Sequence, residues 1–129
     1  MGGYIGPSPV SSNRLGNIIV DTAVAATYEN EDANGNLALN FTDNQNFILT
    51  LTGNVTLANP TTEQVGQSGF IVFVQDGTGG HTLSLGTDFE TAGGTGVTLS
   101  TAASATDVVP YIVMANNRIL LGSALLAFA

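Results

Sequence analysis

The clearest pattern along the chain is an alternation of apolar and polar positions. It occupies residues 37–42, 47–52 and 55–57. A period of two puts successive side chains on opposite faces of a β-strand, so each stretch predicts a half-buried strand. Turn residues 43–46 and the Gly53-Asn54 pair separate the three stretches, which predicts a β-meander closed by a tight hairpin.

The second half of the chain contains further short segments of strand character. Residues 70–74 form a continuous apolar run, which predicts a strand buried on both faces, and residues 101–107 could form one helical turn. Shorter strands are predicted at 81–85, 97–99, 108–114, 118–121 and in the apolar tail to Ala129. Many short strands between Gly and Asn turns, without a long amphipathic segment, predict an all-β fold, either an antiparallel β-sandwich or a jelly-roll-like domain.

The N-terminal stretch follows neither pattern. Residues 1–16 contain Pro7, Pro9 and four glycines, and proline disfavours helical geometry in the residue before it. We therefore expect an extended N-terminal arm, residues 1–16, ahead of a β-sandwich domain, residues 17–129. A small domain offers few places to bury the apolar side chains of such an arm, so the arm should bind a neighbouring protein.

Composition and charge exclude several classes of protein. Ten carboxylates face only Arg14 and Arg118, which gives a net charge of −8, and there is no lysine or cysteine. Phosphate backbones and anionic lipids repel such a chain, so neither nucleic acid nor a membrane is expected as a partner. The start of the chain lacks the features of a signal peptide, so folding is expected in a cytoplasm. Without lysine to guard the sheet edges, we expect the sandwich itself, other copies of the subunit or a larger assembly to cover them.

A glycine-rich stretch at 75–86 contains the single histidine, His81. A phosphate-binding loop requires a lysine and a following helix, and both are missing, so the stretch predicts a hairpin turn with glycines at positive φ. A metal site at His81 would have to use carboxylates as its other ligands, and no Gly-x-Ser-x-Gly elbow accompanies the histidine as a base. We expect His81 to be a structural strand residue, with no metal or catalytic role.

Acidic residues raise two alternatives. The run 29–36 does not have the spacing of an EF-hand loop and predicts a solvated turn, although an irregular calcium site stays open. Asp88 and Glu90 could in principle serve a glycosidase, but that chemistry needs one carboxyl group with a pKa raised by burial, and the surrounding sequence does not suggest burial. We therefore expect no enzymatic activity and no cofactor.

Three stretches of the chain carry a family resemblance. They are "GYIGPSPV" near the start, "NFILTLTGNVTLANPTTEQVGQSGFIVFVQDGTGGHTLSLGTDFE" in the middle and "DVVPYIVMANNRILLGSALLAFA" at the end. Together they resemble small virion proteins of tailed bacteriophages, both capsid decoration (cement) proteins and domains of tail-fibre proteins. The resemblance implies a β-rich module that oligomerises, often as a trimer, and binds a preassembled viral surface.

Between those two roles, chain length favours the capsid. A tail fibre usually has a shaft and a receptor-binding tip, and 129 residues leave no room for both. We therefore expect a decoration protein that binds the major capsid protein on the outer surface of the phage head and stabilises it; a tail-fibre or host-adhesion module is the alternative. The arm residues expected to contact the capsid are Tyr4, Ile5, Pro7, Val10 and Arg14.

Overall fold

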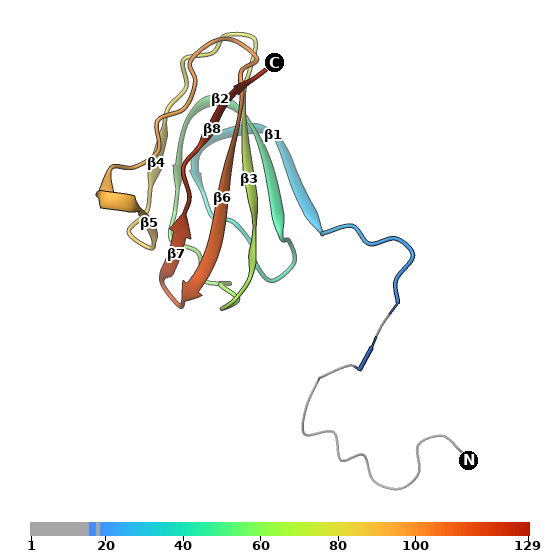
Figure 1. The fold of residues 1–129 in the computed structure, drawn as a ribbon. Coiled ribbons are helices and arrows are strands. Elements are labelled where there is room, and N and C mark those ends of the chain that lie inside the picture. The colour runs from blue at the N-terminus through green and yellow to red at the C-terminus, as the bar shows by residue number, and fades with distance from the viewer. Residues whose placement is uncertain (1–15, 18) are drawn as a thin grey trace, which may run out of the picture.

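The structure is a computed structural model, and it describes residues 16, 17 and 19–129. These residues form eight strands and one short 3-10 helix, η1 (Figure 1). The strands are β1 (Thr27–Leu37), β2 (Asn46–Leu57), β3 (Ser68–Gln75), β4 (Leu83–Leu85), β5 (Phe89–Thr91), β6 (Thr106–Ala115), β7 (Arg118–Leu121) and β8 (Leu125–Phe128), and η1 is Ala92–Gly94. The predicted all-β sandwich fold is confirmed. Within the described residues, no helix is long and apolar enough to cross a membrane.

All eight strands belong to one sheet whose longest path runs β1-β2-β3-β6-β7-β5. The sheet is mixed and not antiparallel throughout. The pairs β1/β2, β2/β3, β2/β4 and β5/β7 are parallel, while β3/β6, β6/β7 and β6/β8 are antiparallel. Figure 1 shows the sheet curling round one interior, with β4 and β5 on one side and β3 and β6 on another.

At two places in the sheet, one edge of a long strand pairs with two different strands, one after the other. β1 follows one edge of β2 over its full length, so β3 and β4 both pair with the opposite edge, β3 along 47–51 and β4 along 55–57. In the same way, β7 and β8 share one edge of β6. In each case the chain leaves the sheet, makes a loop and resumes pairing in its original direction.

The core is built by the inward positions of these alternating strands. Phe41, Phe47 and Tyr111 form an aromatic cluster, with ring centroids 5.1 Å and 5.3 Å from Phe41 to Phe47 and to Tyr111. Both contacts are edge-to-face, a geometry that adds about 0.5–1.5 kcal/mol beyond the burial of area. The remaining large apolar side chains that are fully buried are Leu49, Leu51, Val55, Leu57, Ile71, Phe73, Val109, Val113 and Ile119.

The predicted meander over 37–57 is wrong. β2 runs through Gly53 without turning, and a Cβ at this glycine would lie 3.1 Å from the Cβ of Asn34. Gly53 therefore lets β1 approach β2 closely, at the place where their register shifts, and does not form a hairpin.

The strand predicted at 37–42 is also absent, although Leu39 and Phe41 are buried. The hydroxyl of Thr62 replaces a strand partner there, because it accepts a hydrogen bond from the Phe41 N–H (2.9 Å) and donates one to the Leu39 carbonyl (3.2 Å). Buried backbone groups need partners, and a side chain can supply them.

Four other segment predictions differ from the structure, and His81, predicted to be a strand residue, lies in the loop before β4. The acidic run 29–36 is part of the long strand β1 instead of a turn, and residues 97–99 pack on the core without forming a strand. Residues 101–107 contain a turn at Ser104, where φ is +61°, and then enter β6. The fourth concerns β3, which is buried on one face only, because Phe70 on the other face is 51% exposed.

Candidate functional site

The arm residues predicted to contact the capsid, Tyr4, Ile5, Pro7, Val10 and Arg14, lie outside the described residues. The remaining predicted sites are the glycine-rich loop, the acidic run and the pair Asp88 and Glu90. All three are described, and each has a defined structural setting.

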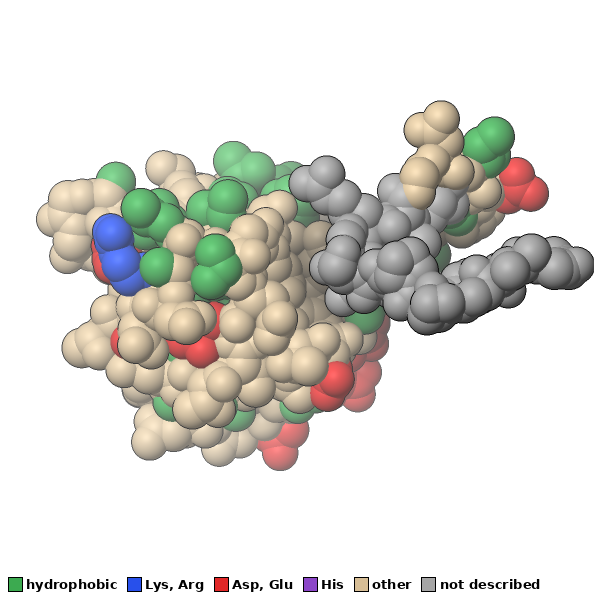
Figure 2. Space-filling model, turned by 90° about the horizontal axis from the view of Figure 1, so that it is seen from below, with side chains coloured by type: hydrophobic (Ala, Val, Ile, Leu, Met, Phe, Trp, Pro, Cys, Tyr) green, Lys and Arg blue, Asp and Glu red, His purple; other side chains and the backbone are tan. Residues whose placement is uncertain are grey.

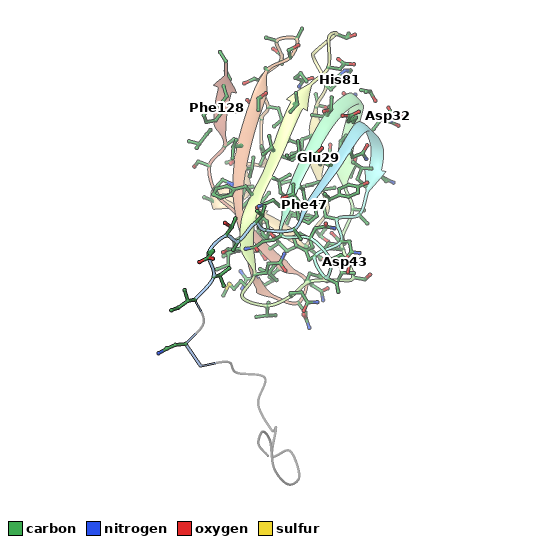
Figure 3. The ribbon with its side chains drawn as sticks, turned by 90° about the vertical axis from the view of Figure 1, so that its right-hand side faces the viewer. Glu29, Asp32, Asp43, Phe47, His81 and Phe128 are labelled. Atoms are coloured by element: carbon green, nitrogen blue, oxygen red, sulfur yellow. The ribbon has the colours of Figure 1, made fainter. Side chains whose placement is uncertain are left out.

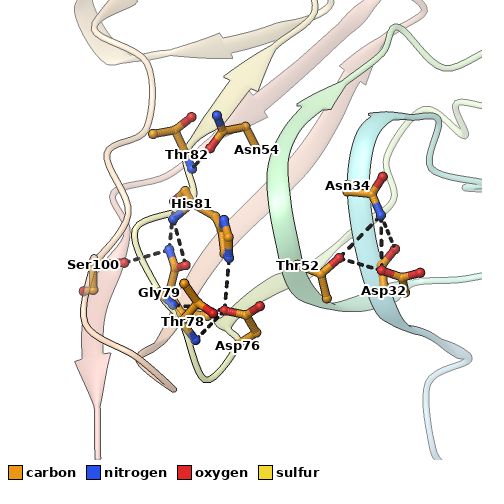
Figure 4. A network of polar contacts seen from close by, with 11 residues as sticks. Asp32, Asn34, Thr52, Asn54, Asp76, Thr78, Gly79, His81, Thr82 and Ser100 are labelled. Atoms are coloured by element: carbon orange, nitrogen blue, oxygen red, sulfur yellow. Dashed lines mark hydrogen bonds and ion pairs between the residues drawn. The ribbon is translucent and has the colours of Figure 1, made fainter.

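The glycine-rich loop is an ordered excursion between β3 and β4 and not a hairpin, because these two strands do not pair with each other. The Asp76 carboxylate organises it: Oδ1 accepts hydrogen bonds from the N–H groups of Thr78 (2.8 Å) and Gly79 (2.9 Å) and lies 3.0 Å from His81 Nε2 (Figure 4). The bonds from Gly79, Thr78 and His81 hold the pKa of Asp76 below its ordinary value. Gly79 and Gly80 adopt φ values of +72° and +79°, as predicted for turn glycines.

Two buried polar side chains, Gln75 and Asp107, fix the same end of the sandwich. Gln75 donates from Nε2 to the carbonyls of His81 (2.8 Å) and Ser100 (2.9 Å) and accepts at Oε1 from the His81 N–H (3.0 Å). Asp107 accepts three hydrogen bonds, from the N–H and Oγ of Ser100 and from the N–H of Ala127. Among the described residues, no buried side-chain nitrogen or oxygen lacks a partner, which is typical of a structural network.

Sequence reasoning missed these two residues, although a signal existed. Gln75 continues the buried alternation of Ile71 and Phe73, and Asp107 precedes the buried alternation of Val109 and Tyr111. A polar residue in phase with buried positions predicts an internal hydrogen-bonding role.

The acidic run lies on the exposed face of β1. Asp32 Oδ1 accepts hydrogen bonds from Thr52 Oγ1 (2.5 Å) and Asn34 Nδ2 (3.2 Å), and Asn34 also contacts the Thr52 hydroxyl (Figure 4). These bonds tie β1 to β2 where their register shifts. Within the described part of the chain, no group of three or more His, Cys, Asp or Glu side chains could hold a metal ion.

Asp88 and Glu90 differ in burial. Asp88 is 9% exposed, whereas Glu90 is exposed enough to form a bidentate ion pair with Arg118, through Nε (2.7 Å) and Nη2 (2.9 Å). This pairing lowers the pKa of Glu90. A glycosidase acid needs a raised pKa, so the setting of Glu90 does not suit that role.

Glu90 also lines an open groove of about 690 Å³ between β4, β5 and residues 94–97. The lining combines glycine backbone and the hydroxyl side chains of Ser84, Thr87, Thr91 and Thr95 with four apolar side chains, Leu83, Leu85, Phe89 and Val97, and we call this the hydroxyl-lined groove. Such a surface offers hydrogen-bond donors and acceptors, with one ion-paired carboxylate at its side.

A different surface lies on the outside of β2, β3 and β6. We call it the outer apolar face and define it as Ile48, Phe70, Val72, Val108, Pro110 and Ile112. One row across the sheet pairs Ile48 with Val72 and Val72 with Val108, and Phe70 pairs with Pro110 beside it. Figure 2 shows hydrophobic side chains gathered along one side of the body. In Figure 3, the acidic residues Glu29 and Asp32 lie on β1, whereas Phe128 lies on β8, away from them.

An open groove of about 340 Å³ lies within this face, and its lining is almost entirely apolar. The residues that line it are Thr27, Asn46, Ile48, Phe70, Val72 and Val108. Thr27 is the first residue of β1, so the groove begins where the preceding chain leaves the body.

Comparison with known proteins gives one family. A family model described as "Putative phage tail fibre C-terminal domain" matches residues 40–115. This range extends from just before β2 to the end of β6 and includes Gln75, Asp107 and the hydroxyl-lined groove. Searches of curated proteins and of solved structures find no match.

Proposed function

The chain belongs to this phage tail fibre C-terminal domain family and is a structural component of a phage virion, and from this we propose that it serves as a binding module of the tail fibre. The observation that carries the proposal is the match over residues 40–115, more than half of the chain. The expectation of a capsid decoration protein rested on chain length. A domain of a fibre needs no shaft of its own, so the chain length is not an argument against a location in the tail fibre.

The hydroxyl-lined groove is our proposed contact for the host surface. Its threonine and serine hydroxyls and glycine amides can exchange hydrogen bonds with a polyhydroxylated ligand, so a cell-surface glycan is the ligand class that fits best. We propose binding without cleavage, because Arg118 keeps Glu90 ionised and thus unable to act as a proton donor.

The same proposal includes a homo-oligomer and excludes cofactors, nucleic acid and membrane as partners. The net charge of −8 supports the last two exclusions. Homo-oligomerisation is supported by the outer apolar face, where Phe70 and Ile112 are about half exposed among the described residues.

Immunogold electron microscopy of intact virions tests the assignment. Antibodies against the body of the protein should label the tail. Label confined to the head would instead support the decoration role, with the major capsid protein as partner and the outer capsid surface as location. Either result separates the two roles directly.

Adsorption to host cells tests the groove. Ser84 is exposed and lines it, so Ser84→Trp should fill part of the groove and lower binding of the purified protein to host cells at least tenfold. Thr78→Trp, in the exposed loop outside the groove, is the matched control and should bind normally. Equal binding by both variants would reject the groove as the host contact.

A further inference from the structure

The outer apolar face departs from what a solvated sheet face requires. A sheet with one wet face alternates apolar residues inside with polar residues outside. β2 follows this rule at Thr50, Thr52 and Asn54, but the outward positions of β3 beside it, and of β6 beyond β3, are mostly apolar. Phe70 and Ile112 are 51% and 47% exposed. Contiguous apolar surface of this kind marks an interaction site.

A second apolar element is uncovered beside it. We call residues 19–26 the N-terminal segment; in it, Ile19, Val20 and Val24 are 95%, 59% and 87% exposed. Its end is fixed, because the Ala26 carbonyl accepts hydrogen bonds from the N–H groups of Gln45 (2.8 Å) and Asn46 (3.0 Å). Figure 1 shows the segment leaving the body from the start of β1. The uncovered segment and the uncovered groove therefore meet at Thr27, which lines the groove.

We propose that a second copy of this chain covers the outer apolar face, with its N-terminal segment lying in the groove, and that the exchange is reciprocal. In an extended segment Val20 and Val24 point to the same side, while Asp21 points to the other. These two valines are about 13 Å apart at the rise of a strand, and three neighbouring strands span about 10 Å. The segment can thus cover the row Ile48, Val72 and Val108 with both valines.

Charge favours this surface for contact between copies. Each copy carries a net charge of −8, so copies repel one another wherever their carboxylates meet. The outward residues of β3 and β6, all within the described part of the chain, include no charged side chain. A contact through this face therefore places no carboxylates opposite each other at its centre. An exchange that uses the same patch on both copies closes with twofold symmetry. The inference does not depend on whether the virion site is the tail or the head.

Introduced cysteines test the exchange directly, because the described chain contains none of its own. Val24→Cys and Val72→Cys proteins, mixed and mildly oxidised, should give a covalent dimer on a non-reducing gel. Val24→Cys mixed with Val65→Cys is the matched control, since Val65 is 64% exposed and lies outside the face. This mixture should give no covalent dimer on the gel. The double variant Val24→Cys/Val72→Cys should also give intermolecular products. An internal disulfide in that variant, without a mixed dimer from the single variants, would show that the segment covers its own groove and would overturn the proposal.

Sedimentation equilibrium of the full chain gives an independent measure. The parent protein should associate at micromolar concentration, and Val24→Asp should raise its dissociation constant at least tenfold, while Val65→Asp should leave it unchanged. Phe70→Ser should weaken association as Val24→Asp does. If Phe70→Ser fails to fold, the outcome rests on Val24→Asp, whose exposed side chain contributes little to the fold. A parent that stays monomeric at tens of micromolar would refute the inference whatever the virion labelling shows.

Discussion

Replacing Asp107 by alanine removes the buried carboxylate that holds three parts of the chain together. The side chain extends from β6, accepts two hydrogen bonds from Ser100 at 2.6 and 2.8 Å, and accepts one at 2.8 Å from the N–H of Ala127 in β8. Asp107 itself is 2% exposed. Its loss leaves the Ser100 N–H without this acceptor and removes one of the bonds that hold β8, which otherwise pairs with β6 through the backbone.

The expected cost follows from these contacts. A hydrogen bond to a charged group contributes about 1.5–3 kcal/mol, and a buried donor left without a partner costs about 1–3 kcal/mol. Burying the carboxylate has its own desolvation cost, which the substitution removes, and Ala127 is exposed enough for water to replace its partner. We therefore expect Asp107→Ala to lower the free energy of unfolding by about 2–4 kcal/mol. In urea this should lower the midpoint by roughly 1–2 M.

The measurement is urea unfolding followed by circular dichroism, together with hydrogen exchange at the Ala127 amide, which should lose protection. Asp107→Asn keeps the shape but replaces one acceptor oxygen by a donor, so its loss should be smaller. Asp43→Ala, which removes an exposed carboxylate bonded to Asn40, should change stability by less than about 0.5 kcal/mol. If Asp107→Ala unfolds within about 0.5 kcal/mol of the parent, the network does not stabilise this end of the sandwich.

Three further predictions concern the glycine-rich loop and the aromatic cluster. Gly79→Ala should destabilise the protein by more than about 2 kcal/mol in urea unfolding, because φ is +72° and the new Cβ would lie 2.5 Å from a backbone oxygen. The control is Gly77→Ala, whose new Cβ would meet no neighbouring atom; its free energy of unfolding should stay within about 1 kcal/mol of the parent. Asp76→Asn should lower the urea midpoint at neutral pH. Because the folded pKa of Asp76 is lowered, the variant's difference from the parent should shrink as the pH falls below the ordinary pKa of 3.8 and vanish only below the lowered folded pKa; a difference that does not shrink below pH 3.8 would contradict this. Tyr111→Phe should cost about 1–2 kcal/mol, and because burial raises the pKa of Tyr111, this cost should shrink in unfolding measured above pH 10.

The strands that sequence predicted best are those with one face in the core. The runs that became β3, β6 and β7 carry enough apolar residues to be recognised, and their positions agree with the structure; β8 was recognised from its apolar residues alone, although all four are exposed. β1 was missed because it lies at an edge of the sheet: among its eleven residues only Ala33 is buried, so it has no alternation to read. Strand direction was missed too, because a period of two is the same in parallel and antiparallel pairs.

The surfaces proposed here for binding show a different limit of sequence reasoning. The continuous apolar run at 70–74 predicted a strand with both faces buried, yet Phe70 is half exposed. Such a run indicates that both faces avoid water, but not which chain provides the cover. The hydroxyl-lined groove had no sequence signal. Its lining comes from the single stretch 83–97, but threonine and serine are common throughout the chain, and the sequence does not show that this stretch curves round a groove.

The interrupted strand positions have a consequence for how this protein can vary. β4 resumes on the β2 edge in the direction in which β3 left it, so the sheet fixes where the excursion 76–82 starts and stops, but not its length. Insertions at the exposed tip beside Thr78 would lengthen a surface loop without shifting any strand register, as long as the contacts of Gly79 and His81 are kept. The exposed tip is thus a practical place for an engineer to graft a peptide epitope onto the protein.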